Sequence, residues 1–174
     1  MNSGGVMVME PIDVRDLLAK PGASRRMARE ERLPEMRTEM AAVPEERPVR
    51  IEVLLESVIE GILVSGPLSG EISYRCARCL KDFGGDFRVD VRELFSPHAN
   101  EDRDEYPIRD GQIDLEPMVR DAVVLAIPFS PLCRPDCLGL CPRCGGDRNF
   151  GECSCGPEID PRWAALDQLD LEES

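Results

Sequence analysis

Residues 133–155 read CRPDCLGLCPRCGGDRNFGECSC and hold six of the eight cysteines in this chain of 174 residues. The other two cysteines, Cys76 and Cys79, form an upstream pair with two residues between them. Thiolates separated by a short turn can converge on one borderline metal ion, because the turn aims both sulfur atoms inward. Eight cysteines make two complete sets of four. We therefore expect a fold organised around two zinc ions, each held by four thiolates.

The most specific local signal is the run Cys141-Pro-Arg-Cys144-Gly145. In a metal knuckle of this kind, backbone N–H groups point at the first sulfur atom, and the following proline and glycine supply the φ angles that the turn needs. A tighter chelating pair follows at Cys153 and Cys155. One predicted set is Cys141, Cys144, Cys153 and Cys155, and the other is Cys76, Cys79, Cys133 and Cys137. Spacing alone leaves open which cysteines share an ion.

Disulfides and iron are the alternatives to zinc. The amino-terminal sequence MNSGGVMVMEPIDVRD lacks the features of a secretory signal, so we expect a cytoplasmic protein with reduced thiols. The spacing from Cys137 through Cys141 to Cys144 is also used by radical enzymes, but only 30 residues follow Cys144, too few for their barrel. Another iron–sulfur cluster stays open, because thiolates also hold iron.

The charge of the chain restricts how it could meet nucleic acid. Its 21 Lys and Arg residues and 34 Asp and Glu residues give a net charge of −13, whereas a general phosphate binder has a basic surface. Basic residues gather near the cysteines, where they either neutralise the thiolates or form a rim for RNA backbone. The candidate RNA contacts are Arg75, Arg78, Lys81, Arg134, Arg143 and Arg148.

Apolar alternation predicts an antiparallel sheet in the middle of the chain. Residues 49–56 place an apolar side chain at every second position, which is typical of a strand with one buried face. Further strands are expected at residues 62–64, ended by a Gly66-Pro67 turn, at 71–76, and at 87–91 after a Gly84-Gly85 turn. The short connections between them imply an antiparallel meander.

Helical patterns follow the sheet. Residues 115–126 have helical apolar spacing after Asp114, and their apolar second half predicts a helix buried across the sheet. A last helix is expected from Asp160-Pro161, with Trp163 on its apolar side. The expected fold is thus α+β: an antiparallel β-meander with a buried helix, a cysteine-rich zinc module and a C-terminal helix.

The domain organisation follows from these elements. We expect an α+β core over residues 1–128, with an N-terminal arm and an acidic loop near 96–112. Residues 129–174 would form the zinc-binding module and the C-terminal helix.

Nothing in the sequence predicts an enzyme. The single histidine, His98, lies in a polar stretch typical of an exposed loop, and all-cysteine ligation closes a zinc ion to water. No stretch approaches the roughly 20 apolar residues that span a bilayer. We therefore expect neither a membrane nor a small-molecule substrate among the partners.

The order of motifs resembles the YceD family of large ribosomal RNA subunit accumulation proteins. The matching pieces are CARCLKDF at residues 76–83, IDLEPMVRDAVVLAIPFSPLC at 113–133 and IDPRWAALDQL at 159–169. The resemblance covers roughly residues 12–170, and the stretch 133–155 is similar to the extended cysteine-rich end of part of the family.

The resemblance implies a non-enzymatic role in ribosome biogenesis, with large-subunit rRNA precursor or ribosomal proteins as partners. The leading hypothesis is a zinc-stapled factor that supports accumulation or processing of this rRNA. The second is an acidic adaptor that binds ribosomal proteins and acts on RNA only indirectly. The third is a thiol-based redox or metal-transfer protein, which would need exposed cysteines of low pKa.

Overall fold

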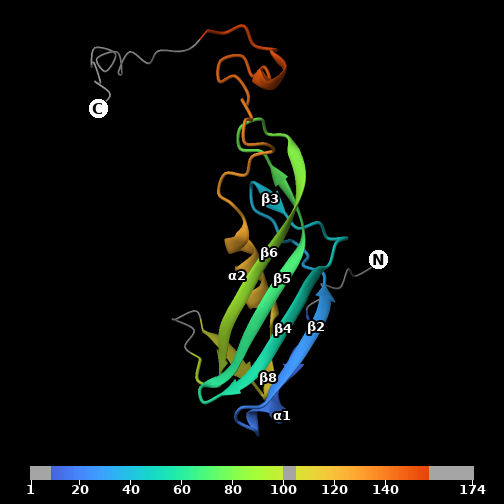
Figure 1. Cartoon of the computed structure of the whole chain (residues 1–174), viewed down its shortest axis with the longest axis vertical. Helices are drawn as coiled ribbons and strands as arrows, with labels where there is room; N and C mark the ends of the chain where they lie inside the picture. Colours follow the sequence, from blue (N-terminus) through green and yellow to red (C-terminus); the bar gives the residue numbers. More distant parts are fainter. Residues whose placement is uncertain (1–8, 100–104, 157–174) are drawn as a thin grey trace, which may run out of the picture.

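The computed structural model describes residues 9–99 and 105–156, which form an elongated, mostly β molecule (Figure 1). Strands account for 43% of the described residues and helices for 13%. The sheet curls into a half-barrel, and one longer helix lies against it. The cysteine-rich segment extends from one end of the long axis, opposite the end that carries the short first helix.

The sheet has eight strands in the order β1-β8-β7-β6-β5-β4-β2, with β3 paired beside β5. Its strands are β1 Ile12–Asp13, β2 Ser24–Glu31, β3 Ala41–Ala42, β4 Val49–Val58, β5 Gly61–Arg75, β6 Asp82–Ser96, β7 Tyr106–Arg109 and β8 Gln112–Ile113. All neighbouring strands are antiparallel except β6 and β7, which pair in parallel.

The core lies on the concave side of this sheet. Val49, Ile51, Val53 and Leu55 of β4 are buried, as the apolar alternation predicts. Helix α2, Glu116–Ala126, adds three buried residues, Met118, Val119 and Val123. Helix α1, Arg15–Leu18, is a single turn between β1 and β2, and neither α-helix is long enough to cross a bilayer.

The predicted α+β class is wrong. The described residues are 43% strand and 13% helix, and the strand content exceeds the prediction because the long strands β5 and β6 fill regions where the sequence predicted turns. Gly66-Pro67 lies inside β5 and Gly84-Gly85 inside β6, so neither pair reverses the chain. The predicted C-terminal helix from Asp160 lies outside the described residues.

Two smaller expectations also need correction. The segment predicted as an acidic loop includes β7 and β8, which extend the sheet. The second half of α2 is not buried all round, since Val124 and Leu125 are 46% and 84% exposed. The helix covers the sheet with one side only.

Candidate metal centres

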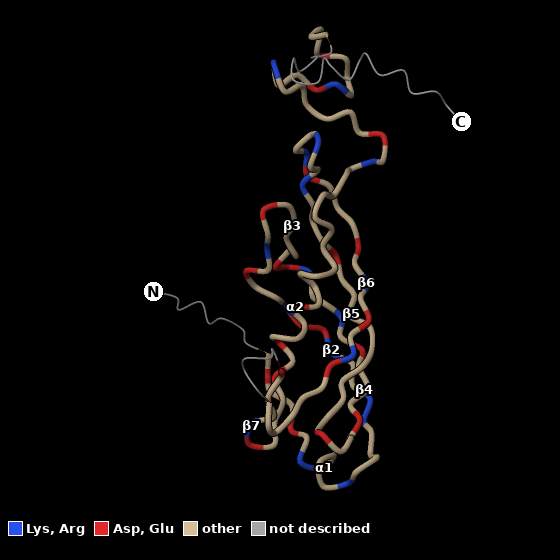
Figure 2. The backbone as a smooth tube through the Cα atoms, turned by 90° about the vertical axis from the view of Figure 1, so that its left-hand side faces the viewer, with Lys and Arg blue, Asp and Glu red and all other residues tan. Residues whose placement is uncertain are grey.

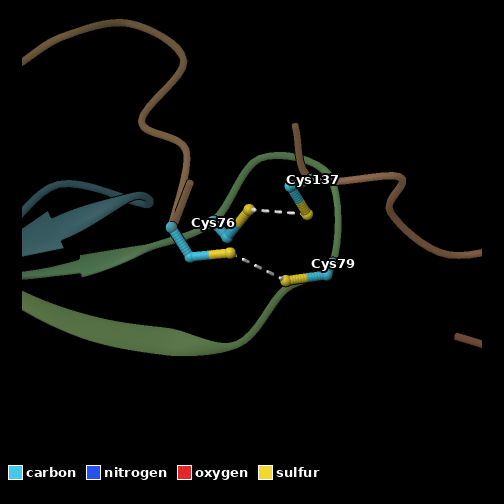
Figure 3. Close-up of side chains that lie close together, drawn as sticks. Cys76, Cys79 and Cys137 are labelled. Carbon is cyan, nitrogen blue, oxygen red and sulfur yellow. Dashed lines mark hydrogen bonds between the residues drawn. The ribbon is translucent and has the colours of Figure 1, made fainter. Parts of the chain in front are cut away.

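Four cysteines meet where the β5–β6 hairpin ends, and we call them the hairpin group (Figure 3). Cys76 and Cys79 lie in the loop between β5 and β6, where Leu80 adopts a left-handed φ of 60°. Cys133 and Cys137 come from the segment that follows α2. All four sulfur atoms lie within 4.8 Å of one another. The group therefore joins the tip of the sheet to the start of the cysteine-rich segment.

The spacing of these sulfur atoms fits a single tetrahedral ion. The Sγ atoms of Cys76 and Cys137 are 3.8 Å apart, and those of Cys79 and Cys133 are 3.7 Å apart. A tetrahedron with Zn–S bonds of about 2.3 Å has sulfur–sulfur edges of about 3.8 Å. A cluster of four irons would spread its thiolates more widely, because each thiolate binds a different iron. All eight cysteines are free thiols, so the disulfide alternative is not what the structure shows.

The second set, which we call the knuckle group, contains Cys141, Cys144, Cys153 and Cys155, again with all sulfur atoms within 4.8 Å. Gly145 has a φ of 72°, and its N–H donates to the Cys141 carbonyl oxygen at 2.8 Å. Only Cys141 of this group is buried. The knuckle geometry is the one that the sequence predicts, with glycine at the left-handed position.

Backbone N–H groups favour one thiolate in each group. Hydrogen bonds from the N–H groups of Cys144 and Arg143 lower the pKa of Cys141 to about 6. Burial raises the pKa of Cys76, but N–H groups of Cys133 and Cys79 outweigh it, and the pKa falls to about 6.

The pKa values of four other thiols, Cys79, Cys133, Cys153 and Cys155, are raised. Burial raises the pKa of Cys133 to about 12, and the neighbouring Cys153 sulfur raises the pKa of Cys155 to about 12. Four thiolates within 4.8 Å would repel one another without a cation between them. A dication would remove this repulsion, which makes both groups suitable metal ligands.

Asn149 connects the two groups. It lies in the 3-10 helix Arg148–Phe150, inside the loop between Cys144 and Cys153, and its side-chain Nδ2 donates to the Cys137 sulfur at 3.6 Å. Its Oδ1 accepts from the Leu138 N–H at 2.8 Å. The loop of the knuckle group thus completes the surroundings of the hairpin group. We did not identify Asn149 from the sequence, because nothing in its neighbours indicates a contact with Cys137.

A second contact between the groups is an ion pair. Lys81 lies 2.8 Å from the buried carboxylate of Asp147, and its ammonium group stands 4.3 Å from the centre of the Phe150 ring. The Lys81 ammonium holds the pKa of Asp147 down at about 2. Lys81 follows the first cysteine pair, whereas Asp147 and Phe150 belong to the knuckle loop. The pair therefore fastens the two loops together.

The candidate RNA contacts all lie around the two groups, and at least five of them, Arg143 included, have partners within the chain. Arg75 pairs with Asp82, and Arg78 donates to the Cys137 carbonyl oxygen at 2.8 Å. Arg134 donates to Asn149 Oδ1 at 2.7 Å, and Lys81 pairs with Asp147. Arg143 and Arg148 are exposed beside the knuckle group. Figure 2 shows acidic and basic residues interspersed along this end of the backbone.

His98 is exposed, as predicted, and its backbone N–H donates to the Ser96 hydroxyl at 3.1 Å. Over residues 9–99 and 105–156, the two cysteine groups are the only gatherings of three or more His, Cys, Asp or Glu ligands.

Comparison with known proteins shows which family and which relatives the chain is similar to. The family model described as "Large ribosomal RNA subunit accumulation protein YceD" matches residues 64–170, a range that includes all eight cysteines. An uncharacterised protein of Mycobacterium tuberculosis is 38% identical over 137 residues, which cover 75% of this chain and 66%, just under two thirds, of that relative's length.

Two further relatives show how far the similarity extends. An uncharacterised protein of Mycobacterium leprae is 32% identical over 166 residues, covering 90% of this chain and 76% of that protein. A maize protein named "Large ribosomal RNA subunit accumulation protein YCED homolog 1, chloroplastic" is 38% identical over 58 residues, or 33% of this chain and 20% of its own length. No solved structure matches the chain.

Proposed function

Because this chain belongs to the YceD family of large ribosomal RNA subunit accumulation proteins, we propose that it is a factor of ribosome biogenesis. It supports the accumulation or processing of large-subunit rRNA and catalyses no reaction. The observation that carries this proposal is the family match over residues 64–170. The absence of catalysis is consistent with all-cysteine groups, since four thiolates leave no position open for a reacting water.

We further propose that each cysteine group holds one zinc ion. The support is the sulfur geometry, with edges of 3.7 and 3.8 Å in the hairpin group. Zinc in the hairpin group would fasten the β5–β6 tip to the segment after α2. Zinc in the knuckle group would order the loop that carries Lys81's partners, Asp147 and Phe150. Both ions are therefore structural in this proposal, and they contribute directly to folding.

RNA contact, in this proposal, centres on the exposed Arg143 and Arg148 beside the knuckle group. Arg78 and Lys81 remain candidate RNA contacts. They also stabilise the fold, because Arg78 hydrogen-bonds the Cys137 carbonyl oxygen and Lys81 pairs with Asp147. A protein-mediated route is the second candidate. It is favoured by the net charge of −13, which opposes binding to bare RNA.

Depletion of the protein in its own cells tests the main proposal. The ratio of mature large-subunit to small-subunit rRNA should fall and should recover when the wild-type chain is supplied. The variant Ile59→Ser should restore the ratio equally, because Ile59 is exposed in the β4–β5 turn, and this turn lies at the end of the sheet opposite the cysteine groups (Figure 1). An unchanged rRNA ratio after depletion would contradict the proposal.

Crosslinking in cells distinguishes the two routes. Direct contact predicts RNA fragments crosslinked near Arg143 and Arg148, and their loss when both are changed to alanine with metal content unchanged. The protein-mediated route predicts crosslinks to basic proteins and none to RNA.

A further inference from the structure

The outward side of α2 carries a strip of four apolar residues and one aspartate that the sheet does not cover. Asp121 and Leu125 follow Pro117 at successive helical turns, so these three residues share one side of the helix. Val124 lies beside them, and Phe129, just beyond the helix end, is 103% exposed. Leu125 is 84% exposed. We call these five residues the α2 strip.

A cavity of about 490 Å³ opens at the amino-terminal end of the α2 strip. Its walls include three prolines, Pro11, Pro107 and Pro117, with Ile113 of β8. A volume of this size accommodates one or two large side chains, since pockets of about 300–1,000 Å³ hold drug-sized molecules. Pro117 and Asp121 line the cavity and also belong to the strip, so the cavity and the strip form one continuous path along α2.

Carboxylates border this path. Glu105, Asp114 and Asp121 line the cavity together with a single cation, Arg109. Asp121 is exposed and accepts a hydrogen bond from the Tyr106 hydroxyl at 2.9 Å, which fixes its carboxylate at the cavity mouth. The acidic border disfavours phosphate, so RNA does not fit this face.

From these observations, we propose that the α2 strip and its cavity bind a basic amphipathic helix of a protein partner. An apolar residue of the partner would enter the cavity, and further apolar residues would lie on Val124, Leu125 and Phe129. Lysines or arginines beside them would meet the carboxylates, as in other complexes where a helix lies in an apolar groove. The distance from Pro117 to Leu125 is about 12 Å at 1.5 Å per residue, or two turns of such a helix.

The charge around the cavity argues against two other occupants. Residues 157–174 of this chain contain six acidic residues and one arginine, so the carboxylates that line the cavity would repel them. A second copy of the chain, with a net charge of −13, would be repelled as well. This proposal specifies what kind of partner the protein-mediated form of the proposed function would use. It rests on the proposed function only for the partner's place in ribosome biogenesis.

The test is a titration of the ¹⁵N-labelled full chain, under reducing conditions with zinc present, using a synthetic leucine–lysine helical peptide of about 14 residues. We expect amide shifts confined to α2, β7, β8 and the adjoining residues Glu105 and Phe129, and binding that weakens as salt rises. The same peptide with glutamate in place of lysine should not bind. Leu125→Ser should weaken binding about tenfold, because the partner then loses an apolar contact. Asp121→Asn should weaken it about twofold.

Matched variants keep the test specific. Ile59→Ser removes another exposed apolar side chain, and Asp90→Asn removes another exposed carboxylate, on β6, so both should bind the lysine peptide like the wild type. Absence of binding, equal binding of the glutamate peptide, or equal losses in the control variants would overturn the proposal.

Other occupants would show themselves in the same spectra. If α2 signals shift when residues 157–174 are deleted, the strip binds the tail. If they shift when the protein is concentrated, the strip binds a second copy, and if they shift when an RNA oligonucleotide is added, it binds RNA. Each of these results would overturn the proposal. If the chain does not bind the lysine peptide but still maintains the rRNA ratio in cells, the proposed function is unaffected.

Discussion

At the scale of single residues, the clearest expectation concerns Asn149. Changing Asn149 to alanine removes the N–H donor to the Cys137 sulfur and the acceptor that holds the Leu138 N–H. Residues that hydrogen-bond metal ligands commonly affect affinity by about 10- to 100-fold, so we expect zinc affinity at the hairpin group to fall about tenfold. Competition with a chromophoric chelator measures this change.

Arg148→Ala is the matched control for Asn149→Ala, since Arg148 is exposed in the same short helix and, among the residues that the structure describes, donates only its backbone N–H, to the Gly139 carbonyl oxygen. It should leave both affinities unchanged. If Asn149→Ala weakened only the knuckle group, the assigned contact with Cys137 would be wrong.

Lys81 provides a second expectation at this scale. Lys81→Ala leaves the carboxylate of Asp147, whose side chain is 7% exposed, without its cation, and this is unfavourable for a buried charge. The knuckle loop should loosen, so its cysteines should react faster with an alkylating reagent. Mass spectrometry of labelled peptides reports the rate at each cysteine. Arg75→Ala should have little effect, because the Arg75–Asp82 pair is exposed at both ends.

These residue-scale contacts mark where prediction from the sequence ends. Spacing was enough to propose two sets of four cysteines, since ligand pairs are local. Lys81 and Asp147 are brought together only by the folded chain, so no local pattern could indicate their ion pair.

At the scale of elements, two glycine pairs show why turns are hard to predict. Gly66 and Gly84 both resemble turn residues in the sequence, yet each continues a strand of 15 residues. Gly66 has a φ of 146°, and a Cβ there would stand 2.2 Å from the Glu52 carbonyl oxygen. Glycine is thus required at position 66 by close strand packing rather than by a turn.

This difference predicts unequal effects of alanine. Gly66→Ala should lower the free energy of unfolding by about 2–3 kcal/mol, because the backbone of β4 must shift to admit a Cβ. Gly84→Ala should change it little, because no heavy atom lies within 4 Å of the added Cβ. Urea unfolding followed by circular dichroism measures both. Equal stability of the two variants would contradict the packing described for β5.

Helix α2 shows that the sequence can predict the position of an element without predicting which of its residues are buried. Its position was predicted well, since apolar spacing and Pro128 define it. The burial of its second half was predicted wrongly. An apolar residue in a helix indicates that its side chain makes an apolar contact, but the sequence does not say whether the contact is with the sheet or with a partner protein. Leu125 is the residue where this distinction matters most.

At the scale of the whole molecule, the two cysteine groups differ in what they join. The hairpin group links residues 54 to 61 positions apart in the sequence, whereas the knuckle group lies within residues 141–155. Closing the longer loop costs more chain entropy, so a metal that holds it removes more conformations from the unfolded state. Loss of the hairpin group should therefore disturb the fold more widely than loss of the knuckle group.

Two single substitutions separate these roles. We expect the purified chain to hold two zinc ions, and Cys79→Ser and Cys144→Ser each to lose about one. In Cys79→Ser, amide hydrogen exchange should accelerate at the adjoining ends of β5 and β6 and in the segment after α2, because the metal ion no longer links them. In Cys144→Ser, faster exchange should be confined to residues 141–156, because the hairpin group still binds its ion. Elemental analysis under reducing conditions, combined with exchange mass spectrometry, measures both effects. Stoichiometric iron with strong visible absorption, or no metal at all, would refute the zinc assignment, and identical exchange patterns in the two variants would refute the division of roles between the groups.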